Sequence, residues 1–360
     1  MSERSTNPVT ETETSNRKRE SPIIIEESNS ESKKQKTEAE ELSSEESKRN
    51  DSGTEEKKQK QQQIAAEKEF KIEANAAEDK GSRHSMEDAW VVLLDASLDS
   101  PGKLRCAHFA IYDGHGGRLA AEYAQKNLHK NVVSSGLPRE LLDVKAAKKA
   151  ILDGMNSLFM SSTAYFLCNI VMQNLLDVKF EVFGKLMSLS FKKVLQVFIA
   201  NIGDAKAVLA RSSIIDGSQN HPDGASPLKA IVLTREHKAI YPQERARIQK
   251  AGGSVSSNGR LQGRLEVSRA FGDRHFKKVG VVATPDIHSF DLTDREHFII
   301  LGCDGLWGVF GPSDAVEFVQ KLLKEGLTVA AVSRRLVREA VLERRCKDNC
   351  TAIIIVFKHS

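Results

Sequence analysis

The sequence lacks a long hydrophobic run. A membrane-spanning helix needs about 18 apolar residues in succession, and the nearest approach, at 163–176, is interrupted by Asn169, Gln173 and Asn174. The N-terminus also lacks the apolar core of a secretory signal peptide. We therefore expect a protein that is not secreted and has no membrane partner.

Cysteine is scarce, and charge of one sign is not concentrated. The 5 cysteines are an odd number without C-x-x-C spacing, which indicates a reducing compartment and argues against a disulfide framework or a zinc cage. The 53 basic and 49 acidic side chains leave a net charge of +4. So small an excess provides no basic stripe, and we expect no nucleic-acid partner.

The N-terminal part is poor in apolar residues. Residues 1–77 contain 18 acidic and 14 basic side chains and a single aromatic, Phe70. Such a segment cannot bury enough surface to offset its chain entropy, which predicts a disordered charged tail over 1–75 and a folded domain over 76–360. Basic clusters at 17–19 and 33–36 suit a nuclear import signal, or are simply part of a solvated charged tail, so we expect the nucleus, the cytoplasm or both.

The folded part alternates groups of strands with pairs of helices. Apolar segments bounded by Gly, Asp or Asn predict strands at 89–94, 106–112, 197–202, 205–210, 230–233, 297–301 and 350–357. Helical periodicity predicts helices at 118–130, 139–152, 242–250, 313–324 and 329–345. Because strands and helices do not alternate singly, we predict an α+β fold, a two-sheet antiparallel β-sandwich flanked by helix pairs. Residues 155–196 have no clear period and receive no assignment.

Acidic residues gather at the ends of the predicted strands. They are Glu87 and Asp88 before 89–94, Asp113 after 106–112, Asp204 between two strands, Asp304 after 297–301, and Asp348 before 350–357. In an antiparallel sheet the end of one strand lies beside the start of its neighbour, so these carboxylates can converge on one edge. Any one of them is more commonly a turn residue, but five such positions favour a cluster. Mg²⁺ or Mn²⁺, which prefer oxygen ligands, would compensate the charge, and two such ions about 4 Å apart clamp a phosphate.

Two further residues near these carboxylates could take part in catalysis or in phosphate binding. His115, in the glycine-rich segment 113–117, could donate a proton to a leaving alkoxide, although it could equally be an exposed turn histidine. Arg83 could bind phosphate oxygens through its guanidinium, although an arginine in such a place more often forms a surface ion pair.

Six short motifs in a fixed order resemble those of the metal-dependent serine/threonine phosphatases of the protein phosphatase 2C type, and the overall pattern looks most like a plant member. Each motif alone is weak, but the ordered set is specific. The motifs are RHSMED at 83–88, YDGHGG at 112–117, ANIGD at 200–204, EVSRAFGD at 266–273, CDGLW at 303–307 and DN at 348–349. The likeness covers residues 76–154 and 197–358.

The resemblance implies a phosphatase domain over 76–360 with a two-metal site at one end of the sandwich. It implies that Glu87, Asp113 and the Gly114 carbonyl hold one Mg²⁺ or Mn²⁺, and that Asp113, Asp304 and Asp348 hold the other. The implied roles of the remaining residues are orientation of metal-bound water by Asp88, phosphate binding by Arg83 and general acid catalysis by His115. The reaction would be direct attack of metal-activated water on phosphoserine or phosphothreonine in protein substrates, without a phosphoenzyme. We expect a monomer.

The sequence departs from this family pattern at two places. Gly308 stands where members often have an aspartate, so we expect a third metal site with Asp204 and Asp304 to be weak or absent. The segment 155–196 lacks the family's Gly-Ser/Ala-Thr-Ala strand, so central strands of one sheet would be missing or replaced. This leaves a non-catalytic phosphatase-like binding protein as an alternative. A metal-dependent nuclease is a third hypothesis, weakened by the lack of a basic stripe.

Overall fold

The structure of the folded part is a computed structural model, which describes residues 70–96, 106–137, 143–161, 168–177, 195–213 and 228–359. These residues all belong to one compact unit, Glu67–Ser360. Residues 1–69 of the tail predicted to be disordered over 1–75, with the basic clusters at 17–19 and 33–36, lie outside the described residues.

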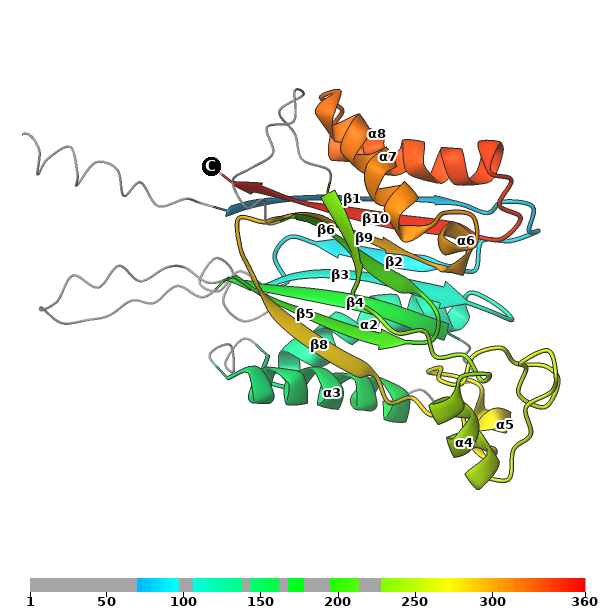
Figure 1. The fold of residues 1–360 in the computed structure, drawn as a ribbon. Coiled ribbons are helices and arrows are strands. Elements are labelled where there is room, and N and C mark those ends of the chain that lie inside the picture. The colour runs from blue at the N-terminus through cyan, green and yellow to red at the C-terminus, as the bar shows by residue number, and fades with distance from the viewer. Residues whose placement is uncertain are drawn as a thin grey trace, which may run out of the picture. The chain divides into compact units, whose positions relative to one another are not determined.

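Two antiparallel sheets form the centre of this unit (Figure 1). Within the described part of the chain each has five strands. The first sheet has the order β1 (Phe70–Asp79), β10 (Cys350–His359), β9 (Glu296–Gly302), β6 (Lys206–Ser212) and β7 (Leu228–Val232). The second has the order β2 (Ala89–Leu93), β3 (Cys106–Gly114), β4 (Cys168–Asp177), β5 (Leu195–Ile202) and β8 (Asp286–Leu292).

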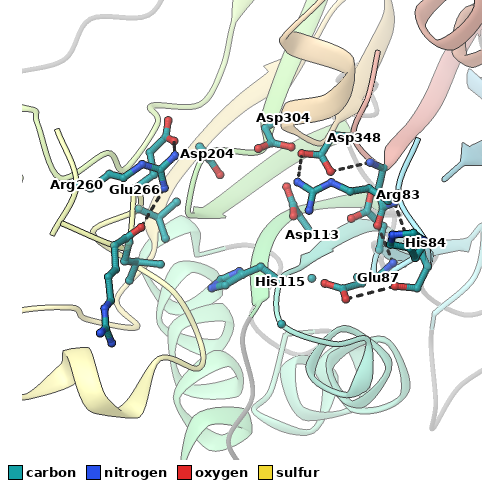
Figure 2. A pocket seen from close by; sticks show the side chains of 18 residues that line it. Arg83, His84, Glu87, Asp113, His115, Asp204, Arg260, Glu266, Asp304 and Asp348 are labelled. Carbon is teal, nitrogen blue, oxygen red and sulfur yellow. Dashed lines mark hydrogen bonds and ion pairs between the residues drawn. The ribbon is translucent and has the colours of Figure 1, made fainter. Parts of the chain in front are cut away.

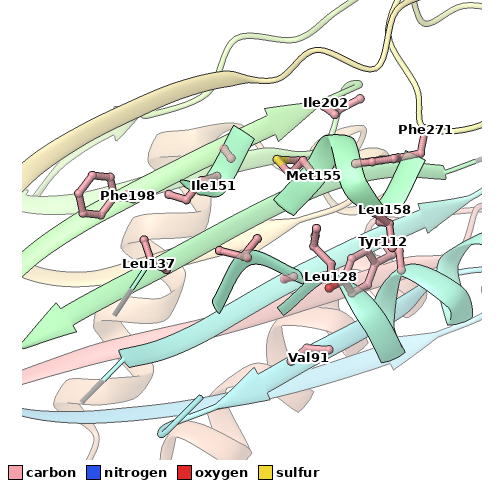
Figure 3. Close-up of a cluster of buried hydrophobic side chains, with 14 of the residues drawn as sticks. Val91, Tyr112, Leu128, Leu137, Ile151, Met155, Leu158, Phe198, Ile202 and Phe271 are labelled. Atoms are coloured by element: carbon pink, nitrogen blue, oxygen red, sulfur yellow. The ribbon is translucent and has the colours of Figure 1, made fainter. Parts of the chain in front are cut away.

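A helix pair covers each sheet. Helices α2 (Leu119–Ser134) and α3 (Val144–Ser161) pack on the second sheet, where Leu128 and Ile151 meet Phe198 and Tyr112 in one buried cluster (Figure 3). Helices α7 (Pro312–Lys324) and α8 (Val329–Arg338) cover the first sheet in a second cluster. The remaining helical segments are α4 (Pro242–Lys250), α5 (Arg274–Lys277), α6 (Asp304–Trp307) and the π-turn η1 (Glu339–Glu343).

A third cluster joins the two sheets. Ile353 and Ile355 of β10 share it with Phe109 and Ile111 of β3, whereas Ile354, between the first two, belongs to the cluster under α7 and α8. Because side chains alternate along a strand, a continuous apolar run such as that of β10 is buried on both faces. The predicted mixed α/β fold with antiparallel sheets is confirmed.

The predicted start of the domain at residue 76 is wrong. Strand β1 begins at Phe70 and pairs with β10 along its whole length, from Phe70 opposite His359 to Asp79 opposite Cys350. Its inward residues include only Ile72 and two alanines, Ala74 and Ala76. Apolar and polar residues alternate along the strand, but the small alanines make the apolar signal weak, and pairing with a distant strand defines the element.

The segment without an assignment, 155–196, contributes to the centre of the second sheet. Its first residues complete α3, where Met155 and Leu158 are buried under the sheet. Strand β4 then pairs with β3, from Gly114 opposite Cys168 to Cys106 opposite Leu176, and with β5 on its other side. The central position is thus filled, and strand order is continuous from β3 to β5.

Candidate active site

All eight site residues predicted from the sequence line one pocket of about 520 Å³ (Figure 2). They are Arg83, Glu87, Asp88, Asp113, Gly114, His115, Asp304 and Asp348. Glu87 and Asp88 precede β2, Asp113 lies near the end of β3, and Asp304 follows β9. Antiparallel pairing of β2 with β3 and of β10 with β9 brings the carboxylates of each pair together, and the packing of the two sheets brings both groups into one pocket.

Three carboxylates form the centre of the pocket. Asp113, Asp204 and Asp304 each present an oxygen within 4.8 Å of the others. Burial, followed by the charge of Asp304, raises the pKa of Asp204 to about 7 and that of Asp113 well above its ordinary value. Burial and the charge of Asp348 raise the pKa of Asp304 as well. Such a cluster is strained by its own charge unless a cation compensates it.

The donor set fits a hard divalent cation. Oδ2 of Asp113 is buried and has no hydrogen-bond partner among the described residues. The pocket offers carboxylate and backbone oxygens, the ligands that Mg²⁺ and Mn²⁺ prefer, and no Cys or His set of the kind that holds zinc. The residues present therefore suit the ions predicted from the sequence.

Close backbone approach shapes this end of β3. A Cβ atom on Gly114 would lie 2.3 Å from the carbonyl oxygen of Glu87, so only glycine allows the two segments to meet in this way. The backbone N–H of Glu87 donates to Oδ1 of Asn349 at 2.7 Å. Nδ2 of Asn349 donates to the carbonyl oxygens of Lys80 and Ser85, both at 3.0 Å. Asn349 thus ties the segment before β2 to the start of β10.

Asp88 and Arg83 occupy different environments. Asp88 is buried, accepts a hydrogen bond from Oγ1 of Thr351 at 2.7 Å, and has its pKa raised by burial to about 6. Nη2 of Arg83 lies 2.7 Å from Oδ2 of Asp348, with 62% of the Arg83 side chain exposed. The Arg83 guanidinium therefore stands at the open side of the pocket.

The opposite wall comes from residues that the sequence analysis did not assign to the site. Arg260 and Glu266 are joined at 3.0 Å, and Glu266 also contacts Nζ of Lys238 at 2.9 Å. Asp204, predicted only for a weak third metal site, lies within the central cluster. The one sequence signal for Glu266 was its place in the motif at 266–273.

Comparison with known proteins explains this arrangement. The model of the family "Protein phosphatase 2C" matches residues 72–350. The chain belongs to the protein phosphatase 2C family. Over 291 residues it is 70% identical to "Probable protein phosphatase 2C 8" of Arabidopsis thaliana, covering 81% of this chain and 80% of that protein. It is 66% identical over 288 residues to "Probable protein phosphatase 2C 67" of Oryza sativa subsp. japonica, covering 80% and 76%.

More distantly related proteins that the chain resembles are also phosphatases of the 2C type. The phosphatase is 36% identical over 307 residues to the human "Integrin-linked kinase-associated serine/threonine phosphatase 2C", covering 81% of this chain and 74% of that protein. Its fold is similar to the crystal structure of serine-threonine phosphatase 2C from Toxoplasma gondii, with a TM-score of 0.62 at 24% identity, covering 80% and 95% of the two chains.

Membership of this family establishes the general activity of the chain. The chain is a metal-dependent serine/threonine protein phosphatase of the plant 2C type, and its substrates are phosphoproteins. Nothing in these comparisons favours the non-catalytic alternative. None of the helices that the structure describes is both long enough and apolar enough to cross a bilayer.

Proposed function

We propose that this phosphatase uses two Mg²⁺ or Mn²⁺ ions per chain. One is held by Glu87, Asp113 and the Gly114 carbonyl, and the other by Asp113, Asp304 and Asp348. The observation that supports the proposal is the convergence of these oxygens, from four separate strand ends, in one pocket where the pKa of Asp113 and that of Asp304 are raised. Divalent cations are the usual remedy for such repulsion.

A third ion is expected to bind weakly. Asp204 and Asp304 lie close enough to share a cation, but Gly308, at the end of α6, offers no side-chain oxygen. A site with fewer carboxylates has a lower affinity for a divalent cation.

The protein's own groups divide the work of phosphate-ester hydrolysis. When bound, the two ions supply charge neutralisation for the phosphate and activation of a water molecule. Asp88, held by Thr351, orients the water, and Arg83 binds phosphate oxygens. The exposed ion pair of Arg83 with Asp348 contributes little, so the guanidinium is free to turn towards the substrate.

The bond changes balance in a single displacement without a phosphoenzyme. The water oxygen bonds to phosphorus while the bond from phosphorus to the Ser or Thr Oγ breaks, and that electron pair moves onto Oγ. His115, on the pocket wall, gives the leaving oxygen its proton, and the proton that the attacking water releases restores it through solvent. General acid catalysis of this kind contributes about 10²–10⁴-fold.

The proposed phosphatase domain is layered, and the proposed protein acts as a single chain. The cluster shared by the two sheets and the outer helix pairs support a four-layer α-β-β-α sandwich with the site at one end. We also propose a monomer in the nucleus, the cytoplasm or both, without nucleic-acid or membrane partners, on the basis of the paired basic clusters and the diluted charge. Light scattering and fractionation test these two points.

A substitution in the metal site tests the central claim. Hydrolysis of a phosphoserine peptide is expected only with Mn²⁺ or Mg²⁺ and to stop with a chelator. Asp113→Ala should lower kcat by about 10³-fold or more, because one residue serves both ions. Asp153→Ala, which removes an exposed carboxylate on α3, is the matched control and should keep full activity. An active Asp113→Ala protein would refute the site.

A further inference from the structure

An aspartate outside the pocket lining reaches His115. Oδ2 of Asp273 lies 3.1 Å from Nε2 of His115, across 158 residues of sequence. The Asp273 side chain is 4% exposed, whereas that of His115 is 33% exposed and lines the pocket. The pair thus joins a buried carboxylate to an accessible imidazole.

The backbone around Asp273 is held in place on both sides. Phe271 packs into the cluster under α2 and α3, and Ala270 is fully buried in the small core beside α4. The Asp273 carbonyl accepts hydrogen bonds from the N–H groups of Phe276 and Lys277, at 2.8 and 3.1 Å, at the start of α5. Its φ of +55° is a left-handed conformation that Asp and Asn tolerate better than other side chains. The carboxylate therefore has a fixed position.

The bond to His115 is not explained by local turn chemistry. The Asp273 carboxylate makes no side-chain cap to α5. Nζ of Lys277 donates to the carbonyl of Ala270 at 2.5 Å and lies near enough to Asp273 for the two charges to attract each other. Burying a carboxylate is costly unless its hydrogen bonds compensate, and the bond that the structure gives it is to a pocket histidine.

We propose that Asp273 is a positioning residue for His115. It accepts a hydrogen bond from Nε2–H, which fixes the ring. The imidazolium then gives its Nδ1 proton to the leaving oxygen, and the neutral ring that results keeps its proton on Nε2. An aspartate holds a histidine in this way in serine proteases. The inference rests on the proposed role of His115 as general acid, and it concerns the orientation of the ring rather than the metal ions.

Two substrates with different leaving groups distinguish the positioning role of Asp273 from a purely structural role. A serine alkoxide needs a proton as it departs, whereas nitrophenolate leaves readily as the anion. In the full-length, Mn²⁺-loaded protein, Asp273→Asn should lower kcat on a phosphoserine peptide by about 10–100-fold, within the range that general acid catalysis supplies. KM for the peptide and kcat on p-nitrophenyl phosphate should each change less than about 2-fold, because no group that binds phosphate or activates water is altered.

A second variant and a control guard against misfolding. Asp273→Gly also accepts the positive φ, and should show the same split between substrates. Asp286→Asn alters another Asp–His pair, with His237 at the same 3.1 Å, whose histidine is fully buried. Asp286 also contacts Arg269 at 2.8 Å, but it does not touch His115, so this variant should change both activities by the same factor or change neither.

A double-mutant comparison distinguishes the two proposals. His115→Gln should show the substrate split by itself, and Asp273→Asn should add less than about 2-fold to it. If His115→Gln gives no split, the general-acid role fails and the positioning role with it. If it gives the split and Asp273→Asn does not, or if the two losses multiply, only the positioning role is overturned. In metal-free protein, ¹⁵N spectra should show protonated Nε2 in His115, and a change of tautomer in Asp273→Asn.

Discussion

At the scale of single residues, the site depends on how closely its backbone segments approach. Gly114 meets the carbonyl of Glu87, and a Cβ on Gly305 would lie 2.0 Å from the carbonyl oxygen of Asn349. Both glycines adjoin proposed ligands, Asp113 and Asp304. The positions of the carboxylates are therefore set by backbone packing rather than by side-chain contacts among themselves.

Gly114→Ala tests this dependence. Its Cβ would lie 2.3 Å from the Glu87 carbonyl oxygen, so the end of β3 or the segment before β2 must move. We expect a loss of about 1–3 kcal/mol of stability, as overpacking typically causes, and at least about a 10-fold loss of kcat. Thermal melts and phosphopeptide kinetics measure both.

Gly311→Ala is the matched control. Gly311 has φ of −71°, and its Cβ would meet Asp314 only at an ordinary contact distance of 3.7 Å. This variant should keep its activity. Equal activities of the two variants would show that the close approach at Gly114 has no bearing on catalysis.

Some site residues could be predicted from the sequence and others could not, for a physical reason. Asp113 and Asp304 come at or just after the ends of apolar strands, and the antiparallel rule places each of them beside the acidic residue that precedes its partner strand, Glu87 for Asp113 and Asp348 for Asp304. The packing of the two sheets then brings the two groups into one pocket. Asn349 and Asp273 act through hydrogen bonds across 262 and 158 residues of sequence, to Glu87 and His115. No local pattern encodes such a bond, because it depends on where the fold brings the two segments.

At the scale of elements, the segment between β7 and β8 forms a small unit with its own core. Ile248 of α4 packs there with Leu261 and Val267, and Arg260 and Glu266 carry part of the pocket wall. Glu244 of α4 holds this unit together, since it contacts Arg269 at 2.8 Å and Arg247 at 2.7 Å. The pocket wall therefore depends on a buried ionic network away from the metals.

Glu244→Gln should loosen this unit in a pH-dependent way. Its side chain is 4% exposed. Glu244→Gln removes the charge that faces both Arg269 and Arg247, and although Asp286 still contacts Arg269 at 2.8 Å, the loss should cost up to about 3 kcal/mol near pH 7. Burial raises the pKa of Glu244, but hydrogen bonds from Arg269, Arg247 and Ser268 outweigh it, and the net pKa is lowered. A lowered folded-state pKa stabilises the fold fully above the unfolded value of about 4.3, and this contribution is lost as the pH falls further.

Denaturant unfolding at several pH values measures the effect. The difference in stability between the native protein and Glu244→Gln should be constant from about pH 7 to 5 and shrink below about pH 4.3. Glu317→Gln, a substitution at an exposed position on α7, is the control and should show little difference at any pH. A difference that instead grows on acidification would contradict the proposed network.

Two strands that the sequence did not predict, β4 and β8, have one property in common. Strands β3 and β9 have strong apolar runs and were predicted nearly to the residue. Strand β8 alternates weakly, and most of it is only half buried, while β4 lies in a stretch without clear period or turn residues. Both are held by backbone pairing with β5, so tertiary context rather than local pattern defines them.

At the scale of the whole molecule, the two sheets contribute ligands from opposite sides of one pocket. Asp113 comes from the second sheet, whereas Asp304 and Asp348 adjoin strands of the first. Ions bound between them would join the sheets and stabilise the native state alone. Metal binding and folding should consequently be linked in this phosphatase.

Thermal melting tests this linkage, because the direction in which Mn²⁺ and a ligand substitution should change Tm is defined. Saturation at 100 times Kd adds about 2.7 kcal/mol to the native state, so Mn²⁺ should raise Tm by several degrees. The charge of Asp304 is one of the like charges that raise the pKa of Asp113 and that of Asp204, and Asp304→Asn removes it. Without metal, this variant should therefore melt at a higher temperature than the native protein near pH 7. Its Mn²⁺-induced shift should nonetheless be smaller, because a ligand is lost. An equal shift in both proteins would place the ions elsewhere, because loss of a ligand lowers the affinity for Mn²⁺ and with it the gain in Tm.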